Sequence, residues 1–101
     1  MRNALTKSFV KEESKDLTVI YQVHIKGPED VDLVIKIDNG NLSFDKGIEN
    51  QPDLTITIDE KVIEEIVTKK NSMQKAFLKG DITVKGSVIL LHNFDKLFKL
   101  N

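Results

Sequence analysis

Two histidines, His24 and His92, are the first candidates for chemistry, because a histidine side chain exchanges a proton near neutral pH. His24 shares the polar side of a predicted strand with Gln22 and Lys26. His92 comes one helical turn before Asp95, on the polar side of a predicted helix. Both positions face solvent in these elements, so we expect surface histidines and no catalytic base.

Two acidic pairs, Asp30 with Asp32 and Asp59 with Glu60, could act as a carboxylate pair or bind a hard metal ion. The chain contains no EF-hand loop, no H-E-x-x-H and no glycine-rich phosphate motif. A turn and a helix N-cap explain the two pairs. The absence of cysteine excludes disulfides, thiol catalysis and thiolate metal sites. The sequence therefore predicts no enzyme, no metal site and no cofactor.

The composition is that of one soluble globular domain spanning residues 1–101, with 31% charged and 40% apolar residues. Fifteen basic and sixteen acidic residues give a net charge of −1. This balance gives no support to binding of nucleic acid or of anionic membranes. The longest apolar run, Val88–Leu91, is far shorter than the roughly 20 residues that a membrane span needs. With no secretory signal at its start, the chain is expected in the cytoplasm, with no integral membrane contact.

Hydrophobic periodicity predicts the elements that position these residues. Alternating apolar and polar residues predict strands, and apolar residues at helical spacing predict helices. The strands are expected at 17–26, 31–38, 42–45, 53–58 and 82–85, and the helices at 2–14, 59–70, 72–80 and from 87 onward. The connections between the first four strands resemble hairpins. We therefore predict an α+β fold with a five-stranded, largely antiparallel sheet and helices covering one face.

The last predicted helix has more apolar residues than one packed face requires. Leu90, Leu91 and Phe94 begin its main apolar stripe, but Val88 and Ile89 lie outside that stripe. Three interpretations remain open at this point. The start of the helix is buried beneath the preceding loops, or it forms a lipid-facing lip, or it contacts a second subunit.

Several segments, in order and with matching spacing, resemble the sterol carrier protein 2 (SCP2) domain. They are D-x-x-I-x-I-D-N-G at Asp32–Gly40, the strand Pro52–Ile58, the helix end Lys75–Gly80 and the strand Asp81–Gly86. The resemblance covers about residues 17–100, and its most specific part is the block A-F-L-K-G-D-I-T-V-K-G at Ala76–Gly86.

The resemblance implies a non-enzymatic carrier domain that holds a fatty acid, a fatty acyl-CoA, a phospholipid or a sterol in an apolar tunnel between helices and sheet. An accessory or dimerisation module, whose apolar surface is filled by a protein partner, is the alternative. Carried over position by position, the expected lining is Ile63, Ile66, Val67, Met73 and Phe77 from the helix pair, Leu90, Leu91 and Phe94 from the last helix, and Ile35 and Phe44 from the sheet.

This chain departs from the family in two places. Only about sixteen residues precede the first strand, where family members usually have a longer helical stretch, so a smaller or more open cavity is expected, or one closed by a second subunit of a homodimer. The segment Thr68-Lys69-Lys70 stands where the family often has glycine, so the bend between the two middle helices is expected to differ.

Overall fold

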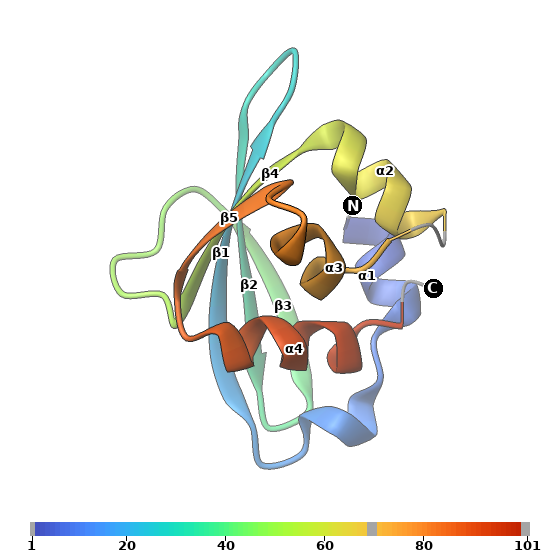
Figure 1. The fold of residues 1–101 in the computed structure, drawn as a ribbon. Helices are drawn as coiled ribbons and strands as arrows, with labels where there is room; N and C mark the ends of the chain where they lie inside the picture. The colour runs from blue at the N-terminus through green and yellow to red at the C-terminus, as the bar shows by residue number, and fades with distance from the viewer. Residues whose placement is uncertain (1, 69–70, 100–101) are drawn as a thin grey trace.

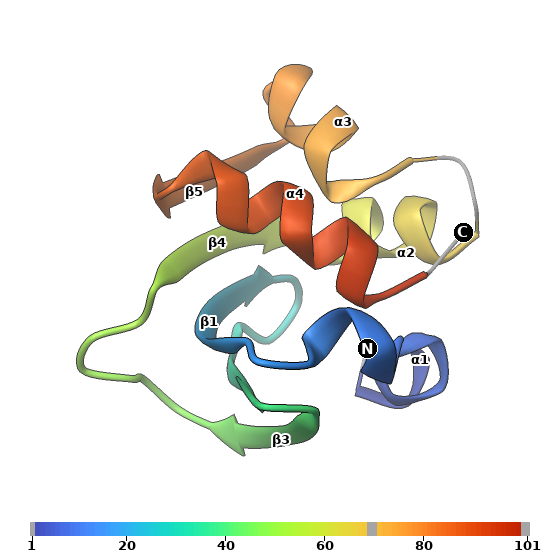
Figure 2. The same ribbon diagram turned by 90° about the horizontal axis from the view of Figure 1, so that it is seen from below.

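The computed structural model describes residues 2–68 and 71–99, and its centre is one five-stranded sheet with helices on one side (Figures 1 and 2). The strands are β1 (Thr18–Lys26), β2 (Val31–Asp38), β3 (Asn41–Lys46), β4 (Leu54–Asp59) and β5 (Ile82–Gly86). They lie in the order β3-β2-β1-β4-β5. This is the predicted α+β fold, and the strands fall where alternating apolar residues placed them.

The sheet is mixed, because β1 and β4 pair in parallel while the other three strand pairs of the described sheet are antiparallel. The β2–β3 connection is a true hairpin, and Asn39 and Gly40 both have the positive φ that its tight turn requires. The predicted hairpin between β3 and β4 is wrong. That connection instead crosses the sheet to the far side of β1.

The crossing segment covers the outer face of the sheet, on the side away from the helices (Figure 1). Gln22 fixes it in place, because its side-chain amide donates to the carbonyl of Gly47 at 2.9 Å and accepts from the N–H of Glu49 at 2.6 Å. Gln22 and Val34 are consequently buried although both point to the outer face. A pattern of alternating residues does not reveal this second, smaller buried region.

The helical layer consists of α1 (Arg2–Ser8), the 3-10 helix η1 (Lys11–Ser14), α2 (Glu60–Val67), α3 (Met73–Leu78) and α4 (Val88–Leu97). The predicted single helix at 2–14 is interrupted at Phe9 and Val10, because this backbone pairs with the chain beyond α4. Val10 donates its N–H to the carbonyl of Leu97 at 2.8 Å. Helix α2 ends at Val67, so the Lys69-Lys70 end of the predicted helix lies outside the described residues.

Helix α3 begins at a doubly capped N-terminus. Ser72 accepts a hydrogen bond from the N–H of Lys75, as its N-cap position predicts. In addition, the Asp95 carboxylate on α4 accepts from the N–H groups of Met73 and Gln74, both at 3.0 Å. Asp95 thereby joins α3 to α4 and satisfies two backbone donors at the start of a very short helix.

The core between sheet and helices is centred on aromatic residues. Tyr21, Phe94 and Phe98 are almost completely buried, and Tyr21 meets Phe94 edge to face at 5.2 Å between ring centroids. The Tyr21 hydroxyl donates to the backbone carbonyl of Leu90 at 2.8 Å. These contacts hold α4 against the middle of the sheet.

Candidate functional site

A cavity of about 800 Å³ lies between the helical layer and one end of the sheet. It is bounded by helices α1 and α2 and by the neighbouring ends of β1, β2 and β3. The residues that line it are Asn3, Ala4, Thr6, Ile25, Val31, Leu33, Phe44, Lys46, Glu60, Ile63, Glu64, Val67 and Thr68. Its volume lies within the range of roughly 300–1,000 Å³ that small-molecule sites occupy.

Strand alternation explains the apolar floor of this cavity. Ile25 pairs with Val31, and Leu33 pairs with Lys46, so these side chains share the face that the helices cover. Ile63 adds an apolar wall from α2. The floor is apolar because this end of the sheet belongs to the same inward face as the core.

The cavity is open to solvent, which the exposure of its apolar lining shows. Val31 is 44% exposed and Val67 is 37% exposed, although both line the cavity. Helix α1, which is only seven residues long, contributes Ala4 to the lining.

Three charged groups lie on the cavity wall, and none forms an ion pair with another described residue. Lys46 comes from the edge strand β3, whereas Glu60 and Glu64 come from helix α2, which follows β4. Strands β2 and β1 lie between β3 and β4 in the sheet. The basic group and the two acidic groups therefore reach the cavity from different sides, one from β3 and the others from α2.

The structure brings three of the ten expected lining residues to this cavity: Phe44, Ile63 and Val67. Five others are core residues with at most 1% exposure, namely Ile35, Ile66, Met73, Leu91 and Phe94. Phe77 and Leu90 are partly buried against the core. The cavity thus lies nearer to α1 and to the β1–β2 end than the resemblance implied. Contact of any of the ten residues with a lipid stays a prediction.

The resemblance did not single out several lining residues that the structure places at the cavity. Ile25, Val31 and Leu33 are the clearest examples. The only sequence signal for them is that they occupy the inward-facing alternate positions of the predicted strands, and ordinary core residues occupy such positions too. Ala4 and Thr6 lie in a helix that the resemblance did not cover.

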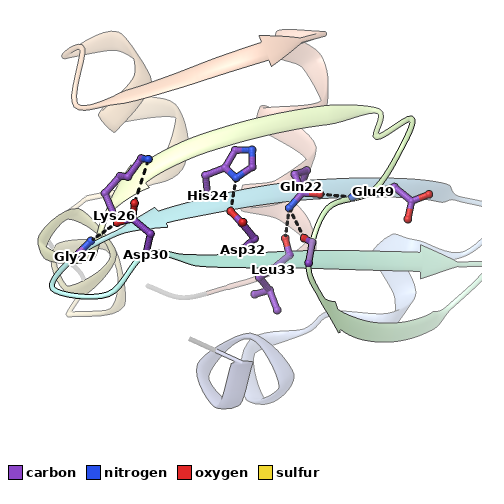
Figure 3. Close-up of polar contacts among 9 residues, drawn as sticks. Gln22, His24, Lys26, Gly27, Asp30, Asp32, Leu33 and Glu49 are labelled. Atoms are coloured by element: carbon purple, nitrogen blue, oxygen red, sulfur yellow. Dashed lines mark hydrogen bonds and ion pairs between the residues drawn. The ribbon is translucent and has the colours of Figure 1, made fainter.

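Of the polar residues considered for chemistry, Glu60 lines this cavity, and the others lie outside it. Figure 3 shows His24 hydrogen-bonded to Asp32 across β1 and β2 on the outer face, and Lys26 paired with Asp30 at 3.4 Å. His92, on the exposed side of α4, lies 3.1 Å from the side-chain oxygen of Gln74. Within residues 2–68 and 71–99, no group of three or more acidic, histidine or cysteine side chains is placed to hold a metal ion.

The exposed start of α4 excludes one of the three interpretations that the sequence left open. Val88 and Ile89 are both exposed, so the interpretation that the preceding loops bury this turn is wrong. Among the helices described, none is long and apolar enough to cross a membrane.

Comparison with known proteins identifies the class of molecule that this fold and cavity represent. Residues 3–99 match the sequence model of the SCP-2 sterol transfer family, and the chain belongs to that family. Sterol carrier protein 2 of Arabidopsis thaliana is 24% identical over 98 residues, which cover 93% of this chain and 80% of that protein. The resemblance found in the sequence is therefore confirmed.

Solved structures confirm the fold. The inverting sec-alkylsulfatase Pisa1 from Pseudomonas sp. matches with a TM-score of 0.80 at 17% identity; the match covers 93% of this chain but 15% of the sulfatase. Palmitated SCP2L2 from Aedes aegypti matches with a TM-score of 0.68 at 21% identity, covering 79% of this chain and 71% of that one. The same fold thus occurs in a small lipid-bound protein and as a minor part of a large enzyme.

Proposed function

We propose that this protein is a non-enzymatic carrier that binds the apolar chain of a lipid in the cavity between α1, α2 and the sheet. The observation that carries the proposal is an open cavity of about 800 Å³ with an apolar floor. Membership of the SCP-2 sterol transfer family and the palmitated Aedes aegypti relative support it. In this proposal residues 1–101 act as one domain, and the cysteine-free sequence suits a reducing compartment such as the cytoplasm.

The hydrophobic effect supplies the affinity. Burying one methylene group contributes about 0.8 kcal/mol, so a long acyl chain gains on the order of 10 kcal/mol before the costs of association. The floor residues Ile25, Leu33 and Phe44, with Ile63 on the wall, provide the apolar surface for such a chain. The charged side chains of the wall, Lys46 among them, are available to a polar head group near solvent.

We expect affinity to rise steeply with the length of the ligand's chain. Displacement of a fluorescent fatty acid by octanoic, dodecanoic and hexadecanoic acid should show micromolar or tighter binding of the longest acid. Each pair of added methylenes should tighten binding by up to about tenfold while the cavity still has room. Equal affinities for the three acids would contradict a site that binds the chain.

Native mass spectrometry of the purified protein separates this proposal from the accessory-module alternative. A carrier is expected to retain lipid or to take up added hexadecanoic acid at one molecule per chain. An obligate dimer that neither retains nor takes up lipid would favour a module whose apolar surface is filled by protein.

A further inference from the structure

The net charge of −1 conceals an uneven distribution of charge along the chain. Residues 71–99, which form α3, β5 and α4, contain five lysines and two aspartates. Residues 2–68 contain eight basic and fourteen acidic residues. The part of the protein built by α3, β5 and α4 is therefore basic, although the whole chain is slightly acidic.

Both acidic side chains of this basic part already have partners. The Asp95 carboxylate caps α3, as described above, and Asp81 pairs with Lys79 at 3.7 Å. Lys75 and Lys96 are exposed and form no ion pair within the described chain. Their positive charge is thus not neutralised locally.

Helices α3 and α4 lie side by side and run in opposite directions (Figures 1 and 2). The contact of Gln74 with His92 fixes their alignment on the exposed side. Leu78 follows Gln74 by one helical turn, and Ile89 precedes His92 by nearly one turn. Leu78 therefore lies on the same exposed side of α3 as Gln74, and Ile89 lies on the same exposed side of α4 as His92.

Three exposed apolar side chains lie on this side of the two helices, and together we call them the α3–α4 patch: Leu78, Val88 and Ile89. Their exposed fractions are 76%, 45% and 70%. Single exposed apolar residues are ordinary on protein surfaces, but a group of them beside free lysines marks an interaction site. Lys75 on α3 precedes Leu78 by three residues, and Lys79, which pairs with Asp81, follows it directly after the helix end. On α4, Lys96 continues the exposed face one turn beyond His92.

The chemistry of the patch favours an anionic lipid surface over other partners. Aliphatic side chains enter the interfacial region of a bilayer, while lysines keep their charge at the head groups and attract anionic lipids. A two-fold contact between copies would place this same basic patch against itself, and like charges would oppose it. Stacking on nucleic-acid bases needs aromatic side chains, which the patch lacks.

We propose that the α3–α4 patch, with Lys75, Lys79 and Lys96, docks the protein on the surface of an anionic lipid bilayer. This docking goes beyond lipid carriage in the cavity, since none of these residues lines the cavity. Such docking is compatible with the slightly negative net charge of the whole chain, because the lysines are concentrated in residues 71–99. The protein would present its basic side to the bilayer and keep its acidic part in solution.

Flotation with lipid vesicles tests the docking directly. Vesicles of roughly one-third phosphatidylserine in phosphatidylcholine should bind the protein at low salt and release it at high salt, and pure phosphatidylcholine vesicles should bind it much more weakly. The double variant Leu78→Ser/Ile89→Ser should weaken binding by about tenfold or more. Lys75→Gln and Lys96→Gln should each weaken it by up to about fivefold.

Two control variants match these substitutions in exposure and chemistry. Ile48, which is 68% exposed on the crossing segment at the outer face, gives Ile48→Ser, and the exposed Lys15 gives Lys15→Gln. Neither should change vesicle binding, and the patch variants should still bind a fluorescent fatty acid like the parent. Failure of fatty-acid binding alone would affect the carrier proposal and not the docking.

Three outcomes would overturn the docking proposal. Equal binding to neutral and anionic vesicles would show that the lysines have no role. Equal weakening by Ile48→Ser and by the double variant would show that the effect is not specific to the patch. No vesicle binding, together with a dimer in sedimentation that Ile89→Ser dissociates, would assign the patch to a second copy.

Discussion

The variant Ile63→Trp is expected to abolish binding of a fluorescent fatty acid while it melts close to the parent protein. Ile63 lies on the cavity wall, so the larger ring extends into space that no protein atom fills. Filling that space removes the volume for the acyl chain but displaces few neighbours. The stability change should stay within about 1 kcal/mol.

Ile66→Trp is the matched comparison, because it makes the same substitution on the same helix one turn away. Ile66 is 1% exposed and belongs to the close-packed core. Overpacking there should cost about 1–3 kcal/mol, and each kcal/mol lowers the melting temperature of a domain of this size by roughly 4–8 °C. The folded fraction of this variant should still bind the ligand.

Thermal melting and fluorescence titration of both variants decide between two locations for the ligand. If Ile66→Trp melted like the parent but lost binding, the ligand site would extend into the layer between α2 and the centre of the sheet. If Ile63→Trp bound fatty acid like the parent, the cavity beside α1 would not be the site.

The buried Tyr21 is expected to make the protein lose stability as the pH rises above about 10. Burial, reinforced by the negative charges of Asp53 and Asp95, raises the pKa of the Tyr21 phenol well above its ordinary value of 10.0. In the unfolded chain the phenol loses its proton near that ordinary value, whereas the folded protein keeps it. Above pH 10 the unfolded state therefore binds fewer protons, and the free energy of unfolding falls by up to roughly 1 kcal/mol per pH unit.

Urea unfolding of the parent and of Tyr21→Phe between pH 8 and about pH 11 measures this effect. The variant should lose less stability over the alkaline interval, although it starts lower by about 1 kcal/mol because the Leu90 carbonyl loses its donor. Tyr21 is the only tyrosine and there is no tryptophan, so phenolate absorbance reports this one group. Phenolate formation near pH 10 in the folded protein would contradict the argument.

Local pattern predicted the elements well because each strand shows its inward face in its own residues. Tyr21 and Val23, for example, alternate with the outward Gln22 and His24, and all four keep those orientations. The parallel pairing of β1 with β4 could not be read in this way. It depends on the path of residues 47–53 over the outer face, and parallel and antiparallel neighbours leave the same alternation in a strand.

The location of the cavity was harder to predict than the fold. Ile63 and Ile66 are both buried on the inward side of one helix, yet Ile63 also lines the cavity and Ile66 does not. That difference depends on how far α1 and the ends of the strands extend over α2. Tertiary packing sets this extent, and the local sequence pattern does not show it. The excess of lysines in residues 71–99 can be counted in the sequence, but the net charge of −1 for the whole chain conceals it.

Isotope-filtered nuclear Overhauser contacts from carbon-13-labelled hexadecanoic acid to the protein test the central claim most directly. The proposal predicts contacts from the acyl chain to Ile25, Phe44 and Ile63, which line the cavity beside α1 and α2. Contacts confined to Leu91 and Phe94, with none to the cavity residues, would contradict it and place the ligand beneath α4 instead.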